Sequence, residues 1–430
     1  MVSTQAATGQ NLEEKPTKQR ILLVLILLFT VTVAYFDRVN VSVLVANNDF
    51  LADMGIKGQP VQIGMMMTVF LIAYGIGNVV LSPIGDYIGP RKSMSIAIVL
   101  WAVSMVIGGL TSLFAIMLAS RFLLGIGEGL HFPMQSTYVK KWFPRQERAR
   151  ANAIWFIGTS LAPALAMPVF AWIIGTLGWR TSFGACVAIG LVPLYLVWFY
   201  TTDTPAESKR VNALELAHIE AGLEKEASRE EGGRQALLEN FKMLAANYRF
   251  WLLVVYYAVH NFVYWGLLTW LPTYLKTARG FSWTQMGVLA SMPFILSIVM
   301  KLIGGWASDW VGRRAPFSVI ATLGSAVGIY FTATVTNNYA AAALICFGMG
   351  VLTLGAPMAF TMLQEMVPGR TISLGAGIMN GLSFCFASLG PLFIGYCISM
   401  TGGFDGALYL LVGMALIGFV ATSILALQKY

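Results

Sequence analysis

Charged residues are scarce in this sequence. They make up 11% of the 430 residues, whereas hydrophobic residues make up 57%. In a water-soluble domain about a quarter of the residues are charged and fewer than half are apolar. No soluble fold can bury so much apolar surface. The composition therefore excludes a water-soluble protein and predicts a chain whose outer surface is covered by membrane lipid.

Cysteine is scarce as well. The four cysteines are Cys186, Cys346, Cys385 and Cys397, and each lies inside an apolar segment. None of them forms a CxxC or CxxH pair, so the spacing indicates neither a zinc site nor a disulfide framework. We expect no metal ion, and we interpret the four thiols as small core residues.

Enzyme motifs are absent. The sequence contains no HExxH, GxSxG or Walker loop and no soluble domain that could house one, so we expect neither an enzyme nor a bound cofactor. The net charge of +8 does not indicate nucleic-acid binding, because no solvated domain is left to form a basic face. The first twenty residues lack an apolar stretch that ends at a small-residue cleavage site, so no cleaved signal peptide is expected.

Long apolar segments dominate what is present. A helix needs about 20 apolar residues to cross the hydrocarbon core of a membrane. The segments that qualify are 21–46, 61–84, 93–110, 113–138, 150–174, 180–200, 250–275, 284–307, 315–335, 339–363, 372–398 and 404–427. They predict an all-α membrane protein with twelve transmembrane helices.

Basic residues in the short loops predict the orientation, because such residues favour the cytoplasmic side. With the N-terminus inside, fourteen of them lie in the cytoplasm: Lys15, Lys18, Arg20, Arg91, Lys92, Lys140, Lys141, Arg145, Arg148, Arg150, Arg313, Arg314, Arg370 and Lys429. Four lie outside: Lys57, Arg180, Lys276 and Arg279. We therefore expect a multi-pass plasma-membrane protein, in the inner membrane of a bacterium, with both termini cytoplasmic.

The chain divides into two related halves. Residues 201–249 form a polar cytoplasmic linker, in which Ala213–Arg234 is predicted to be an amphipathic helix with solvated glutamates. A shift of 223 positions aligns residues in several separate helices: Asp86 with Asp309, Gly89 with Gly312, Gly125 with Gly348, Gly158 with Gly381, and Pro168 with Pro391. This duplication predicts two pseudo-symmetric six-helix bundles, residues 1–200 and 250–430, with a substrate site between them near the midplane.

Two loops share a pattern rich in glycine and arginine. The loop after the second span is GDYIGPRK, with Asp86, Gly89 and Arg91, and its copy after the eighth span is GWASDWVGRR, with Asp309, Gly312, Arg313 and Arg314. Glycine permits a tight reversal, aspartate can cap the next helix, and arginine holds the cytoplasmic face. The pattern resembles the signature loop of the major facilitator superfamily, where it gates the inner side. Here Ser82 stands in place of the usual leading glycine, and Pro90 replaces one arginine.

Two spans resemble one branch of that superfamily more closely. The first span contains YFDRVN, residues 35–40, and the fourth contains RFLLGIGEG, residues 121–129, followed by Phe132 and Pro133. Both resemble the anion:cation symporter branch. The resemblance implies the major facilitator fold and proton-coupled uptake of an organic anion such as galactonate, a hexuronate, glucarate, tartrate or an aromatic acid.

Five ionisable residues lie well inside predicted spans: Asp37, Arg38, Arg121, Glu128 and Lys301. Each charge in a bilayer core costs at least ~2.5 kcal/mol. Arg38 and Arg121 both lie ~12 Å below the outer ends of their helices, so they can converge on one carboxylate. Asp37 and Glu128 are the predicted proton carriers. The alternative is that these four charges only form structural pairs, whereas Lys301 is expected to snorkel to the cytoplasmic water.

The second half offers mainly neutral polar groups. The same shift aligns Asp37 and Arg38 with His260 and Asn261 in the seventh span. We predict that Tyr74, His260, Tyr264 and Asn380 line the substrate site, with Gln364 as a further candidate. The alternative for each of them is a packing role.

Together these features predict a proton-coupled symporter that imports a small organic anion by alternating access. A sugar acid (a hexonate, hexuronate or aldarate) is favoured, because its hydroxyl groups suit the tyrosine, histidine and asparagine side chains. The expected partners are this anion and membrane lipid, and the carrier is expected to be a monomer. The alternatives are an anion exchanger, an importer of aromatic or dicarboxylic acids, a drug exporter and, remotely, a non-transporting membrane receptor.

The orientation leads to a first prediction. A protease should cut the linker around Glu220 only from the cytoplasmic side, because the loop charges place this segment inside. Inverted vesicles should therefore be cut, while intact right-side-out cells should not. Cleavage in intact cells would overturn the orientation.

Overall fold

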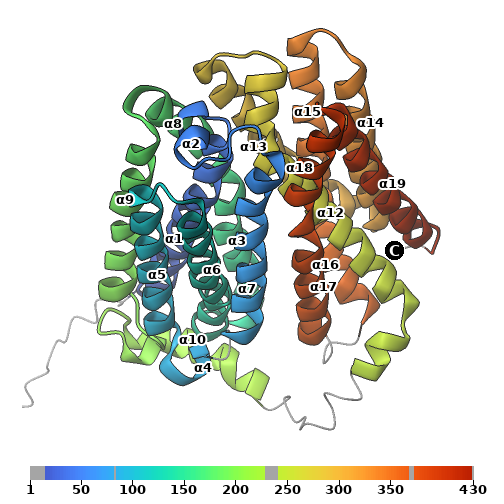
Figure 1. The fold of residues 1–430 in the computed structure, drawn as a ribbon. Coiled ribbons are helices and arrows are strands. Elements are labelled where there is room, and N and C mark those ends of the chain that lie inside the picture. The colour runs from blue at the N-terminus through green and yellow to red at the C-terminus, as the bar shows by residue number, and fades with distance from the viewer. Residues whose placement is uncertain (1–14, 82–83, 228–240, 368–371, 429–430) are drawn as a thin grey trace, which may run out of the picture.

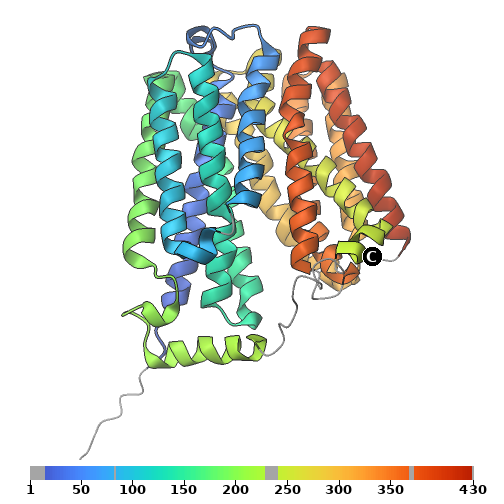
Figure 2. The same cartoon turned by 60° about the horizontal axis from the view of Figure 1, so that its bottom comes forward.

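Helices account for all the regular structure in the described part of the chain. The computed structural model describes residues 15–81, 84–227, 241–367 and 372–428, and it leaves out a few side chains within these ranges, including those of Asp86 and Asp309. Figures 1 and 2 show two helical bundles side by side, with one helix, α10, lying across the end of the first bundle.

The first bundle and the segment that follows it contain these elements: α1 (Gln19–Leu44), α2 (Asn48–Asp53), α3 (Pro60–Val80), α4 (Ile84–Ile88), α5 (Pro90–Leu110), α6 (Phe114–Trp142), α7 (Arg145–Phe156), α8 (Gly158–Leu177), α9 (Trp179–Tyr200), the 3-10 turn η1 (Pro205–Glu207) and α10 (Ala213–Ala227). The second bundle contains α12 (Tyr248–Thr273), the π-helical turn η2 (Tyr274–Ala278), α13 (Trp283–Val311), α14 (Ala315–Thr334), α15 (Asn338–Leu352), α16 (Gly355–Met366), α17 (Ile372–Ala387), α18 (Leu389–Thr401) and α19 (Asp405–Leu427).

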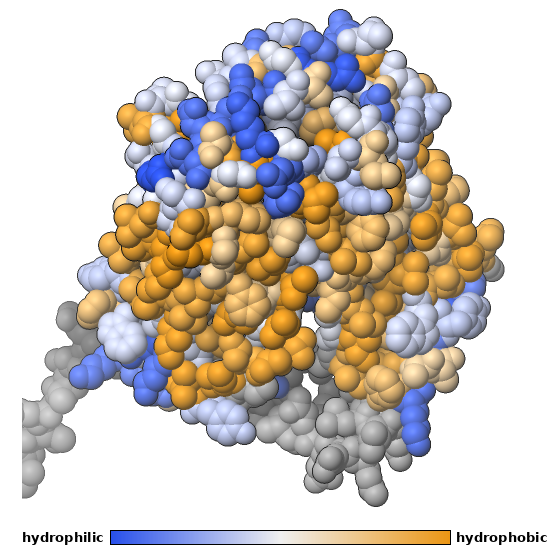
Figure 3. Space-filling view, viewed as in Figure 1, coloured by the Kyte–Doolittle hydropathy of each residue, from blue (hydrophilic) through white to orange (hydrophobic). Residues whose placement is uncertain are grey.

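The twelve predicted spans are confirmed. Twelve helical stretches of the described chain are long and apolar enough to cross a membrane. A broad hydrophobic band crosses the face shown in Figure 3, between hydrophilic residues at the top and near the bottom. Large apolar side chains such as Val79, Leu302 and Trp172 are exposed in the spans, as lipid contact requires.

Local signals set several helix ends. Asn47 caps α2 by accepting a hydrogen bond from the Phe50 amide, and Ser282 forms a capping box with Gln285 at the start of α13. Gly89 precedes α5 with φ of 84°, and Gly312 ends α13 with φ of 70°. The predicted tight reversals in the two signature loops are therefore confirmed, because glycine adopts a positive φ at no steric cost.

Three predicted spans are each built from two helices. The fifth combines α7 with α8 and bends at Ile157, the tenth combines α15 with α16, and the eleventh combines α17 with α18 around Ser388. The sequence predicted a continuous helix for each of these spans. At the first joint a Cβ on Gly158 would lie 3.0 Å from the carbonyl oxygen of Leu28, so glycine lets α8 approach α1 closely.

The two bundles meet through two related helix pairs. The pair α3 with α18 and the pair α8 with α13 each join the second span of one half to the fifth span of the other. At the first contact, a Cβ on Gly64 would collide with the carbonyl oxygen of Pro391. The Thr68 hydroxyl donates to the Ser388 carbonyl oxygen at 2.7 Å. The hydrogen bond lies near the middle of both spans, so the contacts of α3 with α18 run from mid-span toward the end opposite α10, which is at the top of Figure 1.

The linker helix is held by a buried carboxylate. The prediction that the glutamates of this helix face solvent is wrong for Glu215, whose side chain is fully buried. It accepts hydrogen bonds from the Thr17 hydroxyl at 2.6 Å, from the Gln19 amide and from the Arg20 guanidinium. These donors replace water around the charge, so α10 is fixed to the start of α1. Residues 228–234 of the predicted helix lie outside the described residues.

Candidate functional site

A buried ion pair joins α1 to α6 within the first bundle. Arg38 Nε donates to Glu128 Oε2 at 2.5 Å, and the two side chains are 2% and 1% exposed. Removing two charges from water costs several kcal/mol per ion, and a close, hydrogen-bonded pairing is what offsets that cost. The two residues therefore hold α1 and α6 together at this depth.

Aromatic rings from both bundles enclose the Arg38 guanidinium. Its central carbon lies 4.2 Å from the ring centroid of Tyr35, 4.8 Å from that of Tyr74 and 5.5 Å from that of Trp265. Tyr35 and Tyr74 belong to α1 and α3 of the first bundle, whereas Trp265 belongs to α12 of the second. Such rings stabilise a cation through their faces while they exclude water. The guanidinium thus lies at the boundary between the halves.

This ion pair leaves polar atoms without partners. Among the described residues, Nη1 of Arg38 and Oε1 of Glu128 are buried and make no hydrogen bond. Buried polar atoms are nearly always paired in folded proteins. A guanidinium offers five N–H donors and can bind a carboxylate through two of them. Arg38 therefore has donors left for a second anion.

Arg121 and Asp37 form a second charged group nearby. Arg121 is 1% exposed, and its guanidinium contacts the Met105 sulfur at 3.9 Å and lies 5.6 Å from the Phe183 ring centroid. Asp37 is equally buried and lies against the Cys186 thiol, with Arg121, Arg38 and Glu128 as its charged neighbours. Two carboxylates and two guanidiniums therefore share one buried region, and their formal charges balance.

The two arginines were predicted to meet on one anion, and the structure shows them with one carboxylate neighbour in common but otherwise different surroundings. Both have Glu128 as a charged neighbour. Their other surroundings differ, because Arg38 faces rings of both halves whereas Arg121 faces α5 and α9 of the first half. The structure therefore brings Arg38 to the boundary between the halves, and a direct role of Arg121 in binding stays a prediction.

The sequence analysis missed His131, which lies three residues after Glu128 on α6. His131 is 1% exposed, its ring lies 5.2 Å from that of Trp101, and its Nε2 lies 3.2 Å from the side-chain nitrogen of Gln135. Gln135 in turn donates to the Thr30 hydroxyl at 3.0 Å. Buried charge in the sequence is carried by Asp, Glu, Lys and Arg, so it gave no signal for a histidine one turn away.

The candidates in the second half are not all gathered around Arg38. His260 is 4% exposed and stacks on Tyr257, with ring centroids 5.9 Å apart, and its Nδ1 has no partner among the described residues. Tyr264 is half-buried and has Arg38 and Tyr35 as neighbours. Asn380 is half-buried on α17, while Gln364 is exposed near the end of α16. Tyr74 and Tyr264 thus lie near Arg38, whereas His260 lies at another level.

Lys301 does not snorkel as predicted. Its Nζ donates to the Ser160 hydroxyl on α8 at 2.7 Å, and Ser160 lies 3.2 Å from the Ser297 hydroxyl. The amine therefore crosses the boundary between the halves instead of following its own helix to the water. A polar partner lies closer to it than the end of α13 does, which is the physical reason for the difference.

The signature loops bind within their own halves. The Arg91 amide donates to Asp203 at 2.8 Å, and its guanidinium reaches the Trp198 carbonyl oxygen. In the copy, Arg313 binds the Ala426 carbonyl oxygen and Arg314 binds Ser308 and Glu365. These partners tie each loop to its own bundle. The side chains of Asp86 and Asp309 lie outside the described residues.

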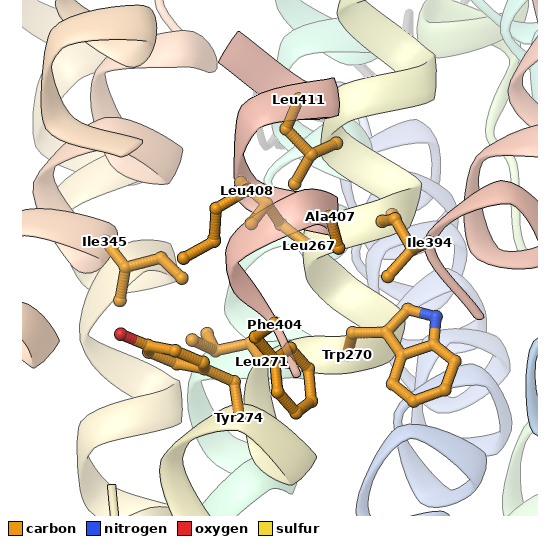
Figure 4. A pocket seen from close by; sticks show the side chains of 11 residues that line it. Leu267, Trp270, Leu271, Tyr274, Ile345, Ile394, Phe404, Ala407, Leu408 and Leu411 are labelled. Atoms are coloured by element: carbon orange, nitrogen blue, oxygen red, sulfur yellow. The ribbon is translucent and has the colours of Figure 1, made fainter. Parts of the chain in front are cut away.

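A small cavity in the second bundle is purely apolar. Leu267, Trp270, Ile345 and Leu411 are among the residues that surround a volume of about 20 Å³, as Figure 4 shows. That volume holds about one water molecule and has no charged lining residue. It is therefore a packing void of the second bundle and no site for an anion.

Two pseudo-symmetric six-helix halves, with buried charges at their boundary, define a membrane transporter and not an enzyme. A sequence profile of the Major Facilitator Superfamily matches residues 27–391 and, in a second match, residues 284–429. The chain belongs to the major facilitator superfamily, which confirms the resemblance found in the sequence and the fold that it implies.

Known relatives extend over nearly the whole chain. A protein named "Probable sulfoacetate transporter" from Cupriavidus necator is 29% identical over 410 residues, which are 94% of this chain and 92% of that relative. One named "Probable galactarate/D-glucarate transporter" from Escherichia coli is 27% identical over 434 residues, 96% of this chain and 94% of the relative. A solved bacterial homolog of the human lysosomal transporter Spinster, inward-facing and occupied, has the same fold, with a TM-score of 0.74 at 16% identity, over 96% of this chain and 98% of that one.

The ion pair predicts a specific pattern of stability. Glu128→Leu alone should lower the stability by about 3 kcal/mol or more, because it leaves the Arg38 charge buried without its partner. Adding Arg38→Met should restore most of the loss, since both charges are then gone. Thermal unfolding of the purified protein in detergent measures both effects.

The surface pair Arg180–Asp53 offers a control for that experiment. The distance between Arg180 Nη1 and Asp53 Oδ2 is 2.8 Å, and the two side chains are 45% and 43% exposed. The hydrogen bond from Arg180 lowers the pKa of Asp53. Arg180→Ala should change the unfolding midpoint little, because solvent screens exposed pairs. An equally small change for Glu128→Leu would show that the buried pair does not stabilise the fold.

Proposed function

We propose that this transporter is a proton-coupled symporter that imports a small organic anion, most favourably a sugar acid, by alternating access. The observation that carries this proposal is the Arg38 guanidinium. It is buried at the boundary between the halves, is paired to Glu128 through Nε, and has Nη1 unpaired among the described residues. This arrangement suits an exchangeable carboxylate.

Glu128 supplies a means of coupling. An ionised Glu128 and the carboxylate of a substrate compete for the same guanidinium, whereas a protonated Glu128 releases it. Proton binding therefore favours anion binding, and thermodynamic linkage makes the effect reciprocal. Asp37 lies in the same charged group and can share the task, so the two carboxylates can titrate as a pair.

The contacts between the halves support alternating access. The hydrogen bond from Thr68 to Ser388 lies near the middle of the spans, and the close approaches at Gly64 and Gly395 lie between it and the end opposite α10. At the α10 end, the contacts that join described residues of the signature loops lie inside their own halves. The loop charges assign the α10 end to the cytoplasm. This conformation is thus proposed to be sealed on the outer side and to release substrate inward.

The relatives support the substrate class. The named substrates, sulfoacetate, galactarate and D-glucarate, are small organic acids. Tyr74 and Tyr264 near Arg38 offer hydroxyl groups that suit the hydroxyls of a sugar chain. We therefore place a sugar acid first among the anions.

The role of Arg38 can be tested by ligand-induced stabilisation. Arg38→Ala should abolish the thermal stabilisation that a carboxylate panel gives the purified protein, where a ligand at a hundred times its Kd adds ~2.7 kcal/mol. Arg38→Lys should restore little, because lysine lacks the planar fork that can hold Glu128 and the substrate together. Stabilisation of Arg38→Ala by the same acids would refute the role.

Arg121 provides a comparison in that assay. Arg121→Ala should also weaken binding, because Asp37 then loses a cationic neighbour and competes for Arg38. Arg121→Lys should restore more of the ligand-induced stabilisation than Arg38→Lys does, since only a positive charge is needed at position 121. Near-normal uptake by Arg121→Ala would remove this residue from the site.

The coupling role of Glu128 predicts a separation of exchange from accumulation. Glu128→Gln mimics the protonated form permanently, so it should still bind the anion and exchange labelled for unlabelled substrate in proteoliposomes. It should not accumulate substrate when a proton gradient is imposed. Asp37→Asn undergoes the same test. If both variants still show concentrative, proton-driven uptake, the proton carrier lies elsewhere or the driving ion is not a proton.

A further inference from the structure

Lys301 carries a positive charge that no acidic side chain balances within the described spans. Its Nζ donates to the Ser160 hydroxyl at 2.7 Å and lies 5.9 Å from the Phe156 ring centroid. Both neighbours are neutral. Glu128 and Asp37, the carboxylates of the charged group, have Arg38 and Arg121 as their cationic neighbours. The amine is only half-buried on α13, so a ligand that enters between the halves can reach it.

Lys301 and Arg38 lie at two levels of the same boundary, and each half supplies one of them. Trp265 on α12 contacts the Arg38 guanidinium, while His260 on the same helix has Lys301 as its charged neighbour. These two residues of α12 are five positions apart, a rise of about 7.5 Å. The spacing suits the two ends of a short dicarboxylate better than it suits one carboxylate.

Charge balance points to the same conclusion. With one of the carboxylates Glu128 and Asp37 protonated, as the proposed symport requires, three buried or half-buried cations (Arg38, Arg121 and Lys301) face one ionised carboxylate. The net charge of the group is then plus two. A dianion balances it, whereas a monoanion leaves one buried positive charge uncompensated, which is costly away from water.

We propose that Lys301 is a second anion-binding residue and that the preferred substrate is a dianion, an acid with a negative group at each end of a short chain. This inference rests on the proposed function of the Arg38 site and specifies its substrate class. Arg38 of the first half binds one end and Lys301 of the second half binds the other. A dianion therefore bridges the halves, which a monoanion does not do.

Pairs of acids that differ by one charge test the proposal. Galactarate and galactonate differ only at C6, which is a carboxylate in one and a hydroxymethyl group in the other, and glucarate with gluconate is a second such pair. Isothermal titration of the purified full-length protein should give a Kd at least about tenfold lower for each dianion than for its monoanion, as expected of one additional desolvated charge pair. Lys301→Met should remove this preference and leave the monoanion Kd within about twofold, while Lys301→Arg should keep it.

Ser160→Ala separates ligand binding from a purely structural tie between α8 and α13. It removes the hydroxyl partner of Lys301 but leaves the charge, so it should keep the preference for dianions. If Lys301→Met lost affinity equally for the dianion and the monoanion, or lost affinity for neither, the proposal would be overturned. Equal affinities of the wild-type protein for both members of each pair would overturn it while leaving the proposed organic-acid transport intact. Binding of none of the four acids would instead refute the sugar-acid assignment and this inference with it.

Discussion

The ion pair between Arg38 and Glu128 constrains the rest of the site. Both side chains are buried away from solvent, so each ion depends on the other for the free energy that hydration would supply. As long as Glu128 is ionised, α1 and α6 must stay together and Arg38 stays occupied. A proton on Glu128 or an anion at Arg38 changes that balance. Once Glu128 is protonated, an anion can take its place at Arg38 without leaving a charge unpaired in apolar surroundings. The proposed coupling therefore uses electrostatics that the fold already needs for its stability.

The duplicated halves share a backbone plan but divide the chemistry between them. The first half supplies the four balanced charges of α1 and α6, whereas the positions equivalent to Asp37 and Arg38 in the second half are His260 and Asn261. The second half adds Trp265 against the guanidinium and the single amine of Lys301. Symmetric helix pairs provide the contact between the halves, and the asymmetric side chains provide the proposed binding site.

The sequence predicted the fold and the charged residues well, because both depend on strong local signals. Spans follow from hydropathy, and glycines such as Gly89 and Gly312 follow from the reversal that a signature loop needs. Contacts between distant helices were harder to predict. The burial of Glu215 depends on donors almost 200 residues away in the chain, and the hydrogen bond of Lys301 depends on how α13 packs against α8. His131 was not predicted because a histidine need not be charged, so its presence in a span is no signal of a site, although it lies one turn from Glu128.

The contact between α3 and α18 uses a main-chain carbonyl as its hydrogen-bond acceptor. Thr68 donates to the carbonyl oxygen of Ser388, and the helices approach closely because Gly64 has no side chain to meet Pro391. Every residue type carries a main-chain carbonyl, so position 388 can change during evolution without losing this hydrogen bond. The donor at 68 and the small residue at 64 cannot be exchanged so freely. Selection should therefore act more strongly on Thr68 than on position 388, whereas Gly64 of α3 and Gly395 of α18 are each required by a close approach to the other helix.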